Sequence, residues 1–320
     1  MEKITRDDIQ TIAQNSNWTE KSASKWLHKS VYSDRKSWIN FLNLLFIGLG
    51  VSLFVAGVLF FFAFNWASLH KFIKIGLIEG LIIAAIAYVY FSKSAEIIKN
   101  SVLTGAAMLV GVLFAVFGQV YQTGANAYDF FLGWTMAVFV WSLVGNFAAL
   151  WLLFIVLVNT TLVLYAVQIS GKWMTTNLIS ILFVLNAGIC IGFHVLKQFT
   201  TKVAIPKWFL ITLSLATVSL GTSSVIMTIF SRYNHQYSIW LSLLPVFLVF
   251  SLALYYAWKA KEIYLLAILI LSLIVIISSK ILEISTDSGS FFSVGIFVIL
   301  AISGTVVGLN SLIKNSKNEE

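Results

Sequence analysis

Glu79 is the one carboxylate well inside a long apolar segment of this sequence. An ionisable side chain in such a segment is costly to expose to lipid, so it usually faces a cavity or a charged partner. Lys74 lies five residues earlier, but five residues on a helix place two side chains about 140° apart around the axis. Glu79 therefore predicts a polar site between helices rather than a local ion pair.

Other polar and aromatic residues gather in two stretches, FFAFNWASLH at positions 61–70 and FGQVYQTGANAYDFFLGW at positions 117–134. We predict that they form one binding pocket for a small polar ligand. The residues assigned to this pocket are Asn65, Trp66, Lys74, Glu79, Gln119, Tyr121, Gln122, Asp129 and Trp134. The alternative is an interfacial belt, because Trp, Tyr, Asn and Gln commonly anchor the ends of membrane helices.

Ten long apolar segments must position these residues. Hydrophobic residues make up 59% of the 320 residues and charged residues 11%, whereas a soluble domain carries about 25% charged residues. A helix needs about 20 apolar residues to cross the hydrocarbon core. The sequence therefore predicts an all-α polytopic membrane protein with about ten transmembrane helices. The expected spans are Phe41–Asn65, Phe72–Phe91, Val102–Tyr121, Phe130–Val144, Phe147–Ile169, Thr176–Leu196, Pro206–Phe230, Ile239–Trp258, Ile263–Leu282 and Phe291–Ile313.

The fourth and fifth spans are separated only by Gly145-Asn146. A single helix from Phe130 to Ile169 would be about 60 Å long, which is about twice the hydrocarbon thickness. Gly-Asn is the one turn signal in this run. We therefore expect a helical hairpin with a very short loop.

Basic residues orient the spans. With the N-terminus inside, 16 of the 21 Lys and Arg residues lie on the inner side and five on the outer side. Cytoplasmic loops carry such an excess, so both termini are predicted to be cytoplasmic in a multi-pass protein of the cytoplasmic (inner) membrane. Spans one and three then end at the outer surface, where spans two and four begin. The predicted pocket would open outward.

By span number the chain divides into four parts. Residues 1–40 are a cytoplasmic helical hairpin with an interfacial segment, 41–169 and 170–313 are five-helix membrane halves, and 314–320 are a cytoplasmic tail. Thr5 and Asn17 are expected to cap the two short N-terminal helices. The hairpin either binds a partner or lies on the membrane, with Trp26 and Trp38 as interfacial anchors.

Small residues predict close helix contacts. Two ridges at steps of four are expected to let spans one and three pack directly, namely Gly48, Ser52 and Ala56, and Ala107, Gly111 and Ala115. Such ridges let helix backbones approach each other in lipid. Gly304 and Gly308 form a GxxxG pair on the last span. This pair serves either packing within the chain or a homodimer.

Span seven carries a seam of small residues at alternating steps of three and four: Ser214, Thr217, Gly221, Ser224, Thr228 and Ser231. The seam predicts a tight helix contact, with a water-filled path as the alternative. Asn159 and Asn186 lie near the centres of spans five and six. They are expected to form an interhelical hydrogen bond or to contact a substrate. Cys190 is expected to be a small packing residue and His194 an interfacial one.

The NW and GQVYQ phrases, followed by FFLGW, resemble a bacterial membrane protein family catalogued as domain of unknown function 2157. Glycines at Gly50, Gly57, Gly105 and Gly111 precede them. The resemblance covers roughly Ile4 to Val144. It implies a membrane protein with a cytoplasmic N-terminal hairpin, and it implies no activity.

The function classes follow from what the sequence contains. HExxH, a Gly-rich phosphate loop and GxSxG are absent from it, so no enzyme motif is recognised. One cysteine excludes an internal disulfide and a Cys-based metal cluster. We expect no cofactor, no metal and no nucleic-acid partner, because the net charge of +8 fits cytoplasmic anchoring charges. Small-solute transport or ligand binding is the leading hypothesis. The alternatives are an envelope structural, sensory or assembly factor and an intramembrane enzyme.

Overall fold

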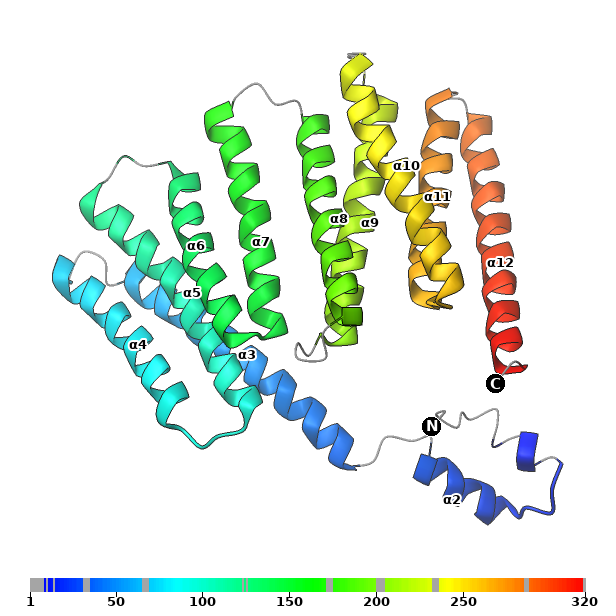
Figure 1. Cartoon of the computed structure of the whole chain (residues 1–320), viewed down its shortest axis with the longest axis horizontal. Coiled ribbons are helices and arrows are strands. Elements are labelled where there is room, and N and C mark those ends of the chain that lie inside the picture. The colour runs from blue at the N-terminus through cyan, green and yellow to red at the C-terminus, as the bar shows by residue number, and fades with distance from the viewer. Residues whose placement is uncertain are drawn as a thin grey trace. The chain divides into compact units, whose positions relative to one another are not determined.

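The computed structural model describes residues 9, 11–13, 15–30, 35–64, 69–122, 124, 126–170, 175–199, 205–231, 236–284 and 288–318. Every regular element in this part of the chain is helical (Figure 1). Ten of these helices are long and apolar enough to cross a membrane. The prediction of an all-α polytopic membrane protein is confirmed.

The long helices follow the predicted spans closely. In chain order the helices are α2 (Glu20–Ser30), α3 (Arg35–Phe64), α4 (Lys71–Phe91), α5 (Glu96–Tyr121), α6 (Ala127–Gly145), α7 (Ala148–Tyr165), α8 (Thr175–Phe199), α9 (Lys207–Phe230), α10 (Gln236–Lys259), α11 (Ile263–Ile284) and α12 (Ser288–Asn318). A π-helix, η1 (Ala166–Ser170), continues α7. The largest differences from prediction are at α3 and α5, where polar residues extend the helix ahead of its apolar stretch.

The predicted turn between the fourth and fifth spans is confirmed. Asn146 adopts the left-handed conformation, with φ 41° and ψ 44°, and its N–H donates to the Ser142 carbonyl at 3.0 Å. The hydroxyl of Ser142 is fully buried and lies 2.8 Å from the Val138 carbonyl and 3.1 Å from the Leu150 carbonyl. Ser142 thereby links the end of α6 to the start of α7.

The chain forms two compact units, Met1–Val120 and Tyr121–Glu320, and each is described by itself. The first contains α2 to α5 and the second contains α6 to α12. The division of the ten spans into two sets of five remains a prediction.

In the first unit α3 touches α5 at one point, and the ridge predicted on α3 is not the contact surface. Val51 of α3 reaches so close to Gly105 of α5 that a Cβ there would lie 2.8 Å from Val51 Cγ1. Gly48 and Ser52 are exposed instead. A branched apolar side chain therefore fills a notch on the opposite helix, where two small surfaces were expected to meet.

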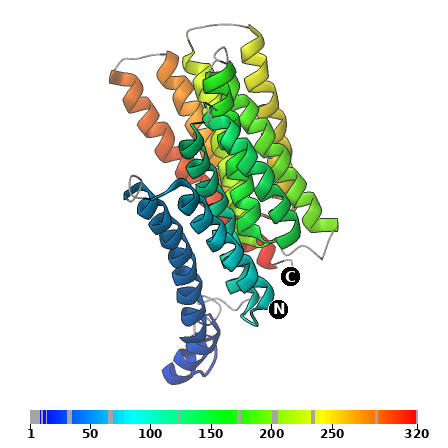
Figure 2. The ribbon, with the colours of Figure 1, turned by 90° about the vertical axis from the view of Figure 1, so that its left-hand side faces the viewer.

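In the second unit α9 is the central helix. It contacts α8 and α11 extensively and also touches α7 and α10. Four members of the predicted seam, Ser214, Thr217, Gly221 and Ser224, are buried, so the tight helix contact is confirmed. Figures 1 and 2 show α7 to α12 running side by side within this unit.

Helix α12 lies at the edge of the second unit, against α11 (Figure 1). No residue of its most apolar stretch is buried. A Cβ added at Gly304 or Gly308 would have nothing within 4 Å. The GxxxG pair therefore does not pack against another described part of the chain, and the expectation of internal packing is wrong.

At the N-terminus, residues 11–13 are helical and α2 follows. Thr19 caps α2, because its hydroxyl accepts from the Ser22 N–H at 3.4 Å. The expected cap at Asn17 is therefore wrong by two residues, while Thr5 lies outside the described residues. The rings of Trp18 and Trp26 stack at 5.9 Å, so aromatic stacking joins the residue before the cap to the body of α2.

Candidate functional site

The residues of the predicted outward-facing pocket are distributed over both units. Lys74, Glu79 and Gln119 belong to the first unit, and Tyr121, Gln122, Asp129 and Trp134 belong to the second. Asn65 and Trp66 lie outside the described residues. The convergence of the whole set therefore stays a prediction.

Helix α4 separates Lys74 from Glu79, as the helical geometry requires. Lys74 is buried in line with Ile78 and Ile82 at steps of four, whereas Glu79 is exposed. Gln119 on α5 is exposed as well. Sequence reasoning assigned the inward position to the carboxylate, and the structure shows that the amine is the buried group.

Asp129 has a structural role that the sequence reading missed. The backbone N–H of Asn126 donates to its Oδ2 at 3.1 Å, which is the reverse half of a capping box at the start of α6. The signal was present in the sequence, because Asn126 and Asp129 have the required spacing of three. Trp134 packs against Phe131 of its own helix at 5.7 Å.

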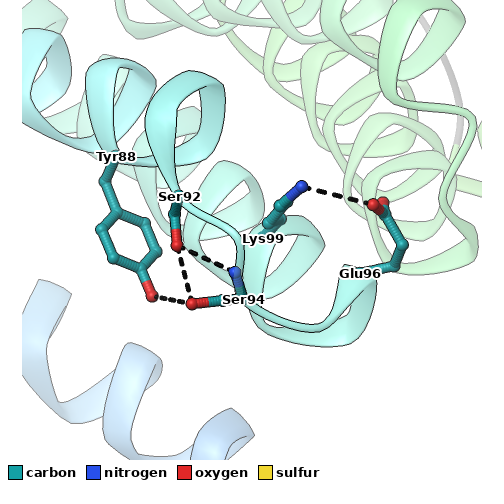
Figure 3. Close-up of polar contacts among 5 residues, drawn as sticks. All are labelled: Tyr88, Ser92, Ser94, Glu96 and Lys99. Atoms are coloured by element: carbon teal, nitrogen blue, oxygen red, sulfur yellow. Dashed lines mark hydrogen bonds and ion pairs between the residues drawn. The ribbon is translucent and has the colours of Figure 1, made fainter.

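The turn between α4 and α5 is held by a small hydroxyl cluster (Figure 3). Tyr88 Oη lies 2.8 Å from Ser94 Oγ, and Ser92 Oγ lies 2.7 Å from the same atom. The Ser94 N–H also donates to Ser92 Oγ at 3.1 Å. Beyond the cluster, Lys99 pairs with Glu96 at 3.4 Å. The hydroxyl bonds join the last turn of α4 to the connecting segment, so we assign the cluster to the geometry of this turn.

The strongest candidate site in the described chain is a cavity of about 360 Å³ in the second unit. Its walls come from α8, α9, α10 and α11 and are mostly apolar. The lining residues are Ala187, Cys190, Ile191, His194, Val195, Ser214, Thr217, Val218, Val249, Phe250, Leu252, Ala253, Tyr256, Leu265 and Leu269. Sequence reasoning did not anticipate this cavity.

Aromatic packing closes one end of the cavity. The rings of Phe183 on α8 and Phe250 on α10 meet edge to face at 6.1 Å. Both rings press on Gly221 of α9, where an added Cβ would lie 2.8 Å from Phe183 and 2.9 Å from Phe250. The seam glycine therefore makes room for two phenylalanines at the floor of the cavity.

Beyond this floor three helices share one hydroxyl centre. Ser180 Oγ lies 2.8 Å from Ser224 Oγ, 2.8 Å from Ser242 Oγ and 2.8 Å from the carbonyl of Thr176. A carbonyl only accepts, so Ser180 donates its one proton to Thr176 and accepts from the other two hydroxyls. The three serines are fully buried. This centre ties α8, α9 and α10 together at their closed end.

At the opposite end the cavity carries a cluster of polar groups. Cys190 Sγ lies 3.6 Å from Ser214 Oγ, which in turn lies 3.4 Å from Tyr264 Oη. His194 Nδ1 lies 2.9 Å from the carbonyl of Cys190. Since a carbonyl only accepts, Nδ1 carries a proton, and in the neutral ring Nε2 is then the acceptor. The ring of Tyr256 meets the His194 ring edge to face at 6.0 Å.

Some of the lining residues on α8 and α10 are exposed. Ile191 and Val195 on α8 and Leu252 on α10 line the cavity and are 51%, 44% and 66% exposed, so we place its opening between these two helices. For helices that cross a membrane, the exposed surface faces lipid. The opening thus connects the cavity with the acyl-chain region of a bilayer.

The polar cluster corrects two sequence-based expectations. His194 is part of the cavity wall and not simply an interfacial residue, and Cys190 is more than a packing residue because it contacts both His194 and Ser214. The sequence did contain a signal for this cluster, because Cys190 and His194 are four residues apart on one helix and the polar seam of α9 offers them partners. In the described chain no three His, Cys, Asp or Glu residues are placed to hold a metal, and no carboxylate lines the cavity.

Asn159 and Asn186 form the interhelical contact that was expected as one alternative. Asn159 Nδ2 donates to Asn186 Oδ1 at 3.2 Å, and Asn186 Nδ2 donates to Asn159 Oδ1 at 2.6 Å. Each amide also donates to a carbonyl of its own helix. The pair links α7 to α8 and does not line the cavity.

Comparison with known families matches residues 4–151 to the family described as "Predicted membrane protein (DUF2157)". The resemblance read from the NW and GQVYQ motifs is confirmed. Comparisons with curated proteins and with solved structures found no match. The family match covers α2 to α6 and ends within α7, so the cavity of α8 to α11 lies outside it.

Proposed function

We propose that this membrane protein binds an amphiphilic molecule in the cavity of α8 to α11. The observation that carries the proposal is the division of this cavity into an apolar body and a polar end, with a lateral opening between α8 and α10. Its volume of about 360 Å³ falls within the range of small-molecule sites, about 300–1,000 Å³.

The two parts of the cavity contribute differently to recognition. Lipid tails are as apolar as a leucine side chain, so an alkyl chain gains little free energy by moving from the bilayer into the cavity. Selectivity must then come from shape and from hydrogen bonds made by the polar group of the ligand. His194, Ser214 and Tyr256 are the side chains that offer such bonds at the polar end.

The orientation of the cavity follows from the basic residues. We use "basic end" for the end of the second unit defined by Lys197, Lys207, Lys259 and Lys261, where α8 and α10 end and α9 and α11 begin. The positive-inside rule supports a cytoplasmic location for this end and for both termini in a bacterial inner membrane. The polar cluster of the cavity is then close to the cytoplasmic headgroup region.

Cys190 provides a direct test because it is the only cysteine of the chain and lines the cavity. The rate of its alkylation by N-ethylmaleimide is measured in the purified protein, with and without monoolein, an uncharged amphiphile. We expect monoolein to slow the reaction several-fold. Equal rates would contradict the proposal, provided that the unfolded protein is labelled fully.

A pair of variants separates filling of the cavity from general effects of a large side chain. Ala253→Trp places an indole in the cavity, while Ser251→Trp places one on the exposed face of the same helix. Ala253→Trp should slow alkylation of Cys190 and remove the effect of monoolein. Ser251→Trp should change neither.

The outward-facing polar site is a second proposal, favoured by one observation. Lys74 is buried within an apolar helix, and a buried cation in a membrane span is costly enough to mark functional sites. We propose that Lys74, with Asn65 and Gln119, contributes to a site for a small polar ligand that opens outward. A cysteine introduced at position 119 should be alkylated by a membrane-impermeant maleimide from the outer side, and labelling from the cytoplasmic side would contradict the proposal.

A further inference from the structure

We infer that the amphiphile bound in the second unit is an anionic phospholipid of the leaflet at the basic end. This inference rests on the proposed function and adds the charge and class of the ligand. Two features of the cavity carry it, namely the charge around its polar end and the shape of its lateral opening.

The charge follows from the spacing of basic residues on the helices that line the cavity. Lys197 lies three residues beyond His194 on α8, and Lys259 lies three residues beyond Tyr256 on α10. Three residues on a helix advance about 4.5 Å and return to nearly the same side. Both lysines are exposed, so each ammonium group lies one turn beyond the polar end, at the side of the opening.

The remaining lysines at the basic end add to this positive charge. Lys207 begins α9, and Lys261 lies in the turn between α10 and α11. Glu262 is the one acidic residue among the described residues of that turn and of the adjoining helix ends. A neutral or cationic headgroup would gain nothing from this excess, whereas a phosphate would be attracted to it.

The lateral opening favours a phospholipid over a single-chain acid. Ile191, Val195 and Leu252 form its rim and are exposed to the surrounding lipid. One acyl chain is able to enter between α8 and α10 while the second chain stays in the bilayer. The headgroup then remains in its leaflet, next to Lys197 and Lys259, and is not carried across the apolar region.

The polar cluster completes the match to a phosphate ester. Phosphate oxygens accept hydrogen bonds, and the tyrosine, serine and lysine side chains at this end are donors. No carboxylate lines the cavity to repel an anion. The phenylalanine floor at Phe183 and Phe250 limits how deeply an acyl chain penetrates.

The test compares lipids that share the same chains and differ in headgroup charge. The full protein is reconstituted into nanodiscs of dioleoylphosphatidylcholine with or without dioleoylphosphatidylglycerol, and alkylation of Cys190 is timed. We expect the anionic lipid to slow alkylation and the zwitterionic lipid to have little effect. Lys197→Gln combined with Lys259→Gln should weaken the effect of the anionic lipid by about 25-fold, since each lysine near an anionic headgroup contributes about fivefold.

A matched control and a second readout distinguish the outcomes. Lys280→Gln removes a lysine at the opposite end of α11 and should leave the effect unchanged. Native mass spectrometry should show a retained phosphatidylglycerol that the double variant loses. Equal protection of Cys190 by the two lipids would overturn the inference, and so would protection by oleate but not by phosphatidylglycerol. In either case, protection by monoolein would still support the proposed function. If no amphiphile protects Cys190, the proposed function itself fails.

Discussion

The two units of this protein differ in how their helices meet. In the first unit the buried residues are mostly apolar, and a valine at Val51 fills the notch at Gly105. In the second unit the central helix α9 buries Ser214, Thr217, Gly221 and Ser224 in one seam. The motifs that are conspicuous in the sequence lie in the first unit and at the start of the second, and the cavity lies in the second.

This difference shows which residues mark a site in a membrane protein. Charged and amide residues are the most conspicuous candidates for a site in an apolar sequence. Glu79 and Gln119 are nevertheless exposed in the first unit. The cavity of the second unit arises where small seam residues and bulky aromatic residues alternate between helices. Its closed end needs Gly221, and its polar end needs the cysteine, histidine and hydroxyl groups that a hydropathy profile ignores.

The largest expected loss of stability comes from Gly221→Leu, which places a large side chain in the seam of α9 in the second unit. Even a Cβ at this position would lie 2.8 Å from Phe183 and 2.9 Å from Phe250, so a leucine forces α8, α9 and α10 apart. Overpacking typically costs about 1–3 kcal/mol and occasionally more, and we expect the upper end. Thermal unfolding in detergent measures it. Gly188→Leu is the matched control, because Gly188 has nothing within 4 Å of its Cβ position.

Gly105→Leu tests whether the first unit is packed as tightly. The group in the way is one side chain, Val51 Cγ1, which has more room to adjust than two phenylalanine rings. We expect a destabilisation of about 1–2 kcal/mol, within the range for overpacked sites. Gly57→Leu, at a position with open space, should change stability little. A larger loss at Gly105 than at Gly221 would reverse the comparison of the two units.

Ser180→Ala tests the hydroxyl centre below the cavity floor. The variant removes the acceptor for Ser224 and Ser242, which lie in a fully buried position. Polar contacts in membrane proteins average about 0.6 kcal/mol, with a maximum of about 1.7 kcal/mol, so we expect a loss of about 1 kcal/mol. Ser279→Ala, whose hydroxyl bonds only within its own helix, is the control. An equal loss of stability in the two variants would show that the hydroxyl centre does not stabilise the contact of α8, α9 and α10.

The smallest expected effect concerns the Asn159–Asn186 pair. Asn159→Leu leaves the amide of Asn186 without its interhelical partner, and the loss should be about 0.5–1 kcal/mol by the same scale. The double variant with leucine at both positions should recover part of that loss, because no amide is then left unpaired. A double-mutant cycle with zero coupling would show that the pair does not stabilise the contact of α7 with α8.

Much of the architecture was predictable from the sequence. All ten spans were found, and the turn at Gly145-Asn146 followed from the length of the apolar run and one turn signal. The seam of α9 was also predictable, because its small residues recur at steps of three and four. These features depend on length and local spacing along one helix.

The faces of the helices were harder to predict, as Gly48 and Lys74 illustrate. Gly48 belongs to a ridge of small residues but is exposed, whereas the charged Lys74 is buried. Asp129 resembled a site residue but accepts a hydrogen bond from the Asn126 backbone N–H as part of a helix cap. Residue type alone did not distinguish these roles.

The sequence by itself determined how many helices are long and apolar enough to cross a membrane, because the hydrocarbon thickness sets the length of an apolar helix. It also predicts, from the basic residues, which side is cytoplasmic. Only the tertiary structure decided which faces meet and where a cavity opens. The physical reason is that lipid is as apolar as the protein interior, so hydrophobicity does not distinguish inward faces from outward ones. Which faces turn inward depends on the shapes of the side chains. Gly221, for example, makes room for Phe183 and Phe250, and a cavity remains beside Cys190 and His194.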